Sequence, residues 1–173
     1  DMIGAGRRER RVLRTQMQMI FQDPFDAMNP RETVGKIVAE PLAIHKKAMT
    51  ADAKRERVGQ ALADVGLTPP SDFFDRFPHE LSGGQRQRVL IAGALVLEPS
   101  VIISDEPVSM LDASLKVEIL HLLGNLQNRH AFAQLMITHD LALTRYVADR
   151  IAILYLGKIM EAGPTRAVLQ HPR

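Results

Sequence analysis

The sequence contains no cysteine and no long apolar run. Without cysteine, the chain cannot form a disulfide framework, use a thiolate nucleophile or build a zinc site on sulfur. The longest uninterrupted apolar run extends from Val89 to Leu97, well short of the roughly 20 residues that a membrane-spanning helix needs. The first six residues also lack the basic and apolar regions of a secretory signal. These absences favour a cytosolic protein.

The 173 residues include 22 Lys and Arg against 20 Asp and Glu, and 46% are hydrophobic. This is an ordinary soluble composition, and the length suits one domain, with or without a small insertion. The basic excess comes mostly from five arginines between Arg7 and Arg14. Such a cluster suits nucleic acid or a membrane surface, but no aromatic residues are interleaved to stack on bases. A solvated face of an amphipathic helix is therefore the simpler interpretation.

Local patterns predict the order of the secondary-structure elements. Residues 16–22 read as a short strand that stops at Asp23-Pro24, and the spacing of apolar residues between Thr33 and Leu67 predicts a helical insert. From Ser82 onward, helix and strand patterns alternate. The predicted elements are a helix at 85–97, a strand at 101–103, a helix around 115–126, a strand at 135–137, a helix at 140–148 and a hairpin at 151–162. We therefore expect an α/β fold whose mainly parallel sheet is covered on both faces.

Two acids, Asp105 and Glu106, follow directly after an apolar strand. Parallel strands present polar residues at their carboxyl ends, where ligands bind, and adjacent side chains project in opposite directions. Asp105 is placed to contact Mg²⁺, usually through water, while Glu106 can orient or deprotonate a water that attacks a phosphoryl group. The alternative, two solvated acids in a loop, does not explain why charge stands so near the core.

Gln22 is the last residue of the predicted strand at 16–22, and His139 comes shortly after the predicted strand at 135–137. Neighbouring strands would bring His139 to the same sheet edge as Glu106. The amide oxygen of Gln22 could complete a magnesium shell or hold a water. The other histidines share no metal-ligand spacing, and His79-Glu80 lacks the second histidine of a zinc protease.

Ser82, Gly83, Gly84 and Gln85 stand immediately before a predicted helix. Glycine allows a ligand to approach the backbone closely, and the N–H groups at a helix start favour an anion such as phosphate. A loop with a helix cap explains the same residues equally well.

Together, these motifs resemble the ordered motifs of ATPase subunits of ABC transporters over almost the whole chain. The segments that carry the resemblance are 20–24, 81–88, 101–107, 109–112 and 137–140. The resemblance implies a P-loop NTPase (RecA-like) core with an ABC-type helical subdomain, and ATP and Mg²⁺ as cofactors. It also implies the following sites: Glu106, His139 and Gln22 for catalysis, Ser82, Gly83, Gly84, Gln85 and Asp112 for nucleotide, and Asp105 and Gln22 for metal.

Shorter motifs resemble the subunits of importers for oligopeptides, dipeptides and nickel; among them are Asn29-Pro30-Arg31 and Gly163-Pro164-Thr165. The resemblance implies a head-to-tail pair with a second ATPase subunit. It further implies docking on membrane permeases, indirect action with an extracytoplasmic solute-binding protein, a place on the inner face of the membrane, and no nucleic-acid partner. We expect residues 1–32 to belong to the core, 33–84 to the helical subdomain and 85–173 to the rest of the core.

The sequence departs from the family in two places. It has no Gly-x-x-x-x-Gly-Lys-Ser/Thr loop, so we expect a fragment that begins after this segment and is inactive alone. Gly93 stands where the family usually has arginine. Two alternatives remain. One is a DNA-associated ABC ATPase, disfavoured because residues 33–67 have no sustained heptads. The other is a non-catalytic regulatory fragment.

Overall fold

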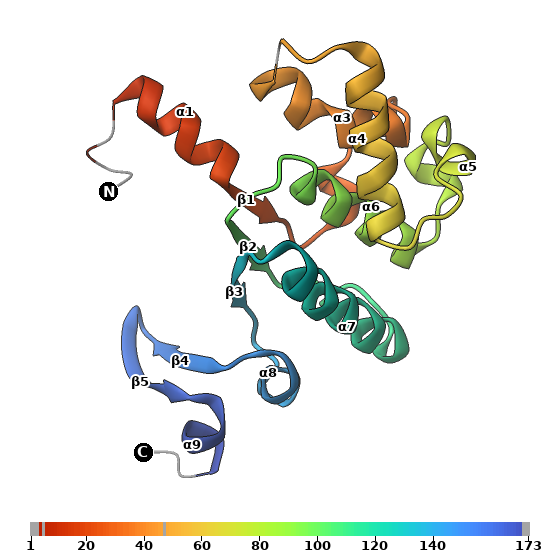
Figure 1. The fold of residues 1–173 in the computed structure, drawn as a ribbon. Helices are drawn as coiled ribbons and strands as arrows, with labels where there is room; N and C mark the ends of the chain where they lie inside the picture. Colours follow the sequence, from red (N-terminus) through yellow and green to blue (C-terminus); the bar gives the residue numbers. More distant parts are fainter. Residues whose placement is uncertain (1–3, 5, 47, 171–173) are drawn as a thin grey trace. The chain divides into compact units, whose positions relative to one another are not determined.

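The computed structural model describes residues 4, 6–46 and 48–170, and these form two compact units (Figure 1). The first unit ends at Ile137 and the second begins at Thr138. Each unit is described by itself below. The expected boundaries at 32/33 and 84/85 stay predictions.

A parallel sheet forms the centre of the first unit. Its strands are β1 (Met17–Ile20), β2 (Val101–Asp105) and β3 (Ala133–Ile137), which lie in the order β1-β2-β3. Ile20 is paired with Ser104, and Asp105 is paired with Ile137. The carboxyl ends of all three strands therefore meet at one edge, and the prediction of a parallel sheet is confirmed.

In the middle stretch, α3 (Val34–His45) and α4 (Ala51–Asp64) pack against the central helix α6 (Gly83–Leu95), and the short α5 (Ser71–Phe74) packs against α3 (Figure 1). Val38, Leu62 and Ile91, one from each of the three long helices, are fully buried. Because α6 also packs against β1, it connects the helical region with the sheet.

The remaining helices of the first unit differ in how much they bury. These are α1 (Arg7–Gln16), α2 (Pro24–Ala27), α7 (Ala113–His130) and the 3₁₀ turn η1 (Pro78–Glu80). Helix α7 buries Ile119, Leu123 and Leu126 along one face, as its apolar spacing predicts. Helix α1 has no buried residue. Within the described residues, no helix is both long and apolar enough to span a membrane.

The two faces of the sheet are covered unequally. Side chains alternate between the faces of a strand, and on one face Ile20, Ile102 and Ser104 are almost completely buried. On the other face, Leu135 is 57% and Ile137 is 49% exposed in the described structure. The expectation of cover on both faces is therefore wrong for these residues. Apolar strands predict burial, but they do not supply the element that buries them.

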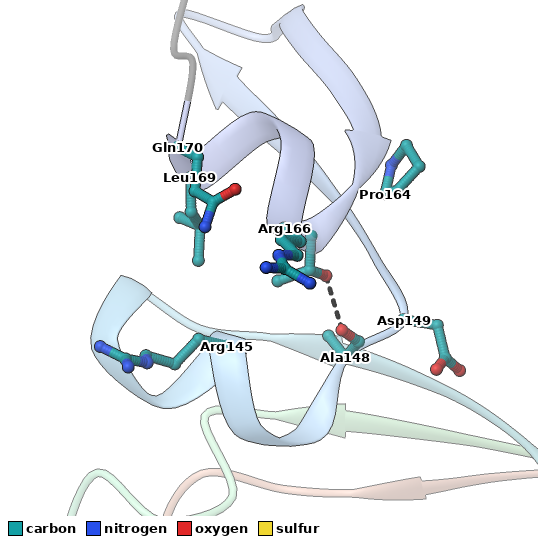
Figure 2. A pocket seen from close by; sticks show the side chains of 8 residues that line it. Arg145, Ala148, Asp149, Pro164, Arg166, Leu169 and Gln170 are labelled. Atoms are coloured by element: carbon teal, nitrogen blue, oxygen red, sulfur yellow. Dashed lines mark hydrogen bonds between the residues drawn. The ribbon is translucent and has the colours of Figure 1, made fainter.

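The second unit is a hairpin with two short helices. It comprises α8 (Leu141–Val147), β4 (Arg150–Tyr155), β5 (Lys158–Pro164) and α9 (Thr165–Gln170). The antiparallel strands β4 and β5 turn at Leu156-Gly157, so the predicted hairpin is confirmed. Both turn residues have a positive φ, as two-residue hairpin turns often require. The Thr165 hydroxyl donates a hydrogen bond of 2.6 Å to the Ala148 carbonyl, which ties α9 to the end of α8 (Figure 2). A cavity of about 580 Å³ lies beside this contact.

Candidate active site at the carboxyl ends of the strands

The structure brings together two of the expected catalytic side chains, those of Gln22 and Glu106. The last pair of β1 and β2 is Ile20 with Ser104, so Gln22 and Glu106 each lie two positions beyond that pair. Gln22 Nε2 donates a hydrogen bond of 3.0 Å to Glu106 Oε2. An amide and a carboxylate that are 84 positions apart in the sequence thus meet at the edge where ligands of parallel sheets bind.

The backbone of Glu106 is held in an unusual conformation. Its φ is 43°, in the left-handed region that residues with a side chain seldom adopt. Three hydrogen bonds fix this turn: the Glu106 N–H donates to the Ile137 carbonyl at 2.9 Å, and the N–H and hydroxyl of Ser109 both donate to the Glu106 carbonyl at 3.1 Å. Such strain at the end of a strand is typical of residues whose side chain must be aimed at a ligand.

Asp105 is the last residue of β2 and is partly buried. Glu106 lies just past the end of the strand and has a left-handed backbone, so strand alternation does not fix the relative directions of the two acidic side chains. Carboxylate and amide oxygens are suitable ligands for Mg²⁺, which is usually held by one or two protein oxygens together with water and phosphate. In the described part of the chain, no group of three or more acidic or histidine side chains could hold a metal alone. The donor chemistry of Asp105 and Gln22 suits Mg²⁺, and binding of the ion by these two residues stays a prediction.

Ser82 and Gln85 form a reciprocal cap at the start of α6. The Gln85 N–H donates to Ser82 Oγ at 3.2 Å, and the Ser82 N–H donates to Gln85 Oε1 at 3.0 Å. A Cβ added to Gly84 would approach Leu115 Cδ2 to 3.2 Å, so this glycine allows α6 and α7 to pack closely. The cap explains part of the motif, and contact of residues 82–85 with nucleotide stays a prediction.

Asp112 and His139 are the two other residues implied by the resemblance. Asp112 precedes α7 and is exposed, and its carboxylate does not cap that helix. His139 is exposed and belongs to the second unit, so its expected position beside Glu106 stays a prediction. The next residue, Asp140, caps α8 by accepting hydrogen bonds from the N–H groups of Ala142 and Leu143 at 3.0 and 3.3 Å.

The sequence analysis missed the interaction by which Ser109 supports the site. Its hydroxyl accounts for one of the hydrogen bonds to the Glu106 carbonyl. Serine three positions after a residue often closes a turn on that residue, and this spacing is the signal that predicts the contact. A second missed contact joins β2 and β3 on the buried face of the sheet, where Gln134 Nε2 donates a hydrogen bond of 3.2 Å to the buried Ser104 hydroxyl.

Comparison with known proteins shows which family the chain belongs to. The model of the ABC transporter family matches residues 2–109. The chain is 44% identical over 170 residues to the oligopeptide transport ATP-binding protein OppF of Bacillus subtilis, covering 96% of this chain and 55% of that protein. The chain belongs to the ABC transporter family, as its ordered motifs indicate.

Solved structures agree with the fold. The structure of cbiO1 from Clostridium perfringens, part of the ABC transporter complex cbiONQ, is similar with a TM-score of 0.84 and 31% sequence identity. The similarity covers 96% of this chain and 64% of the cbiO1 chain. A dimeric structure of the ATP-binding cassette MJ0796 bound to ADP and Pi has a TM-score of 0.77 at 29% identity, with 94% and 69% covered. The expected P-loop NTPase fold is confirmed. The chain spans about half the length of the curated relatives it matches.

Proposed function

We propose that this chain is part of an ATP-binding and ATP-hydrolysing subunit of a bacterial ABC importer that transports peptides. The family assignment supports an ATPase, and the printed name of the relative OppF supports peptides as the transported class. The single observation that carries the catalytic part is the contact between Gln22 and Glu106 at the carboxyl edge of the sheet.

The proposed reaction is phosphoryl transfer from ATP to water. When bound, Mg²⁺ would neutralise negative charge on the phosphates. Glu106 accepts a proton from the attacking water or orients it, and its fixed backbone restricts where the carboxylate can point. The amide of Gln22 positions the Glu106 carboxylate through their hydrogen bond, and its remaining oxygen can contact a water or the metal. His139 would stabilise charge on the γ-phosphate.

The partner proposed for this chain is a second ATPase subunit in a head-to-tail pair. Residues 82–85 would then contact the ATP bound by the opposite subunit, since the start of α6 presents N–H groups that favour an anion. Gly83 is suited to this role because the space beside its Cα is largely open, which lets a ligand approach the backbone. A Cβ added there would meet only Leu111 Cδ2, at 3.9 Å. Asp112 precedes α7 and would lie on the same interface.

The remaining partners are membrane permeases, on which residues 33–84 would dock, and indirectly an extracytoplasmic solute-binding protein. The solved relative cbiO1 is described as part of a transporter complex, which supports assembly of this kind. The ATPase would then act as a peripheral protein at the inner face of the membrane.

Reconstitution tests this function. The intact ATPase, its permeases and the binding protein are placed in liposomes, and uptake of a labelled oligopeptide is measured with ATP supplied on the ATPase side. We expect uptake that requires ATP and stops in the Gln22→Ala and Glu106→Gln proteins. The Asp149→Asn change, at an exposed carboxylate outside the proposed catalytic and docking regions, is a matched control that should leave uptake intact. Equal uptake by all these proteins would contradict the proposal.

A further inference from the structure

Helix α1 has a basic face that the proposed catalytic function does not use. Five of its ten residues are arginines: Arg7, Arg8, Arg10, Arg11 and Arg14. At 3.6 residues per turn, all five fall within about 160° of the helix circumference. Val12 and Leu13 fall on the opposite side. The sequence pattern thus concentrates positive charge on one face of an amphipathic helix.

These arginines are exposed and almost entirely without partners in the fold. All five side chains belong to exposed residues, and in the described part of the chain none forms an ion pair with a carboxylate. Arg11 alone makes a side-chain hydrogen bond that holds the helix, from its guanidinium to the Ile44 carbonyl at 2.9 Å. Glu9 is the only acid in the helix. Ion pairs within the fold therefore do not account for the cluster.

The charge of the cluster acts on its surroundings. Burial lowers the pKa of His45, and the positive charges of Arg11, Arg14 and Lys46 lower it further. His45 is the last residue of α3, and the Arg11 guanidinium of α1 donates a hydrogen bond to the carbonyl of the preceding residue, Ile44. The basic field of α1 thus reaches the surface of the helical region.

Two kinds of anionic macromolecule could use this face, and the residues favour one of them. A single-stranded nucleic acid is bound by basic residues together with aromatic side chains that stack on bases, and α1 contains no aromatic residue. An anionic lipid surface requires only basic residues on one face and modest apolar character on the other. Val12, which is 56% exposed, supplies apolar surface beside the basic face.

We propose that α1 is a docking element for the anionic headgroups of a phospholipid bilayer, held there by Arg7, Arg8, Arg10 and Arg14. The choice of a membrane rests partly on the proposed importer function, which would place the protein against one. Each basic residue near an anionic surface strengthens binding about fivefold, so four such residues suffice for weak, reversible and salt-sensitive attachment.

Co-sedimentation with vesicles tests this proposal on the whole 173-residue chain. Vesicles of phosphatidylglycerol mixed with phosphatidylcholine are compared with vesicles of phosphatidylcholine alone, at low and at high salt. The test variant combines Arg7→Gln, Arg8→Gln and Arg10→Gln. The control variant combines Lys36→Gln, Arg150→Gln and Lys158→Gln, which removes the same charge from exposed residues elsewhere. Circular dichroism checks that both variants fold.

We expect the original chain to bind the anionic vesicles only, and to lose this binding at high salt. Binding should be about 100-fold weaker for the test variant and should change a few-fold at most for the control variant. Equal binding by the two variants, or equal binding to neutral vesicles, would overturn the proposal. Tighter binding to a DNA duplex than to anionic vesicles, with the same dependence on the three arginines, would also overturn it in favour of nucleic acid. Vesicle binding needs neither nucleotide nor permease, so failure here is distinguishable from failure of the proposed ATPase function.

Discussion

His45 illustrates how a single residue responds to its surroundings. Its Nδ1 is buried and has no hydrogen-bond partner in the described structure. Burial, and then the nearby Arg11 and Arg14, lower the pKa of this imidazole below its ordinary value of 6.5. Between the lowered pKa and 6.5, the unfolded chain therefore binds more protons than the folded chain. The contribution of His45 to the free energy of unfolding therefore rises with pH across this window.

Replacing His45 should remove this pH dependence. We expect the stability of His45→Gln relative to the original protein to improve as the pH falls from 7.5 to 5, because only the original must carry an unfavourable proton at low pH. Urea unfolding of both proteins at the two pH values measures the difference. Parallel pH profiles would show that His45 titrates with the same pKa in both states.

The sequence predicted where Glu106 lies, but it did not predict the backbone conformation or the contacts of this residue. The Asp-Glu pair after an apolar strand located Glu106 correctly at the sheet edge, because that inference depends on local pattern. The left-handed backbone of Glu106 and its contact with Ile137 could not be predicted, since they depend on the distant β3 strand lying beside β2. The contact between Gln22 and Glu106 follows only once the register of β1 and β2 is known.

At the scale of elements, α6 contains glycines with opposite structural consequences. An added Cβ at Gly93 would meet nothing within 4 Å, whereas one at Gly84 would approach Leu115 Cδ2 to 3.2 Å. Neither glycine has a positive φ. Gly93 therefore weakens the helix without serving close packing, whereas an alanine at Gly84 would be tight against Leu115 of the neighbouring helix.

We expect Gly93→Ala to stabilise the protein by about 1 kcal/mol, because alanine has less backbone freedom to lose and the space is available. Chemical denaturation monitored by circular dichroism measures the change. In the same helix, Gly84→Ala should be neutral or destabilising, since Leu115 must shift to admit the methyl group. Stabilisation by both substitutions to the same extent would refute this account of their packing.

Element-scale predictions succeeded where the pattern was local. The spacing of apolar residues predicted α6 and α7 within a few residues and a helical insert where α3 and α4 lie, and the turn at Leu156-Gly157 predicted the β4–β5 hairpin. The cover of the sheet was predicted wrongly on the side of Leu135 and Ile137. A strand's own residues indicate that it can be buried, while the element that buries it lies elsewhere in sequence.

At the scale of the whole molecule, the proposed pairing divides each ATP site between two subunits. Ser82→Arg should therefore impair the site of the partner and leave the phosphate-binding part of its own site unaffected. When the Ser82→Arg subunit is paired with a subunit whose phosphate-binding loop is disabled, one of the two composite sites should remain intact. That site combines the phosphate-binding loop of the Ser82→Arg subunit with the unchanged residues 82–85 of the other subunit. We expect partial ATPase activity in the mixture and little in either protein alone, measured as phosphate release. No activity in the mixture would contradict sites shared between subunits.

The 173-residue chain itself should not hydrolyse ATP, because its sequence contains no Gly-x-x-x-x-Gly-Lys-Ser/Thr loop. In the proposed site, Asp105, Glu106 and Gln22 would contact the metal and the attacking water, but they would not replace backbone N–H groups and a lysine around the β- and γ-phosphates. Calorimetric titration with Mg-ATP should detect weak binding or none. Micromolar binding accompanied by turnover would refute this expectation.

The most direct test of the account is the steady-state rate of ATP hydrolysis by the intact ATPase carrying Glu106→Gln. Glutamine can hold a water but cannot accept its proton, so we predict a rate at least about 100-fold lower, with nucleotide binding retained. The exposed Glu40→Gln control should hydrolyse ATP at the original rate. If Glu106→Gln hydrolyses ATP within a few-fold of the original protein, Glu106 is not the catalytic base and the proposed site is wrong.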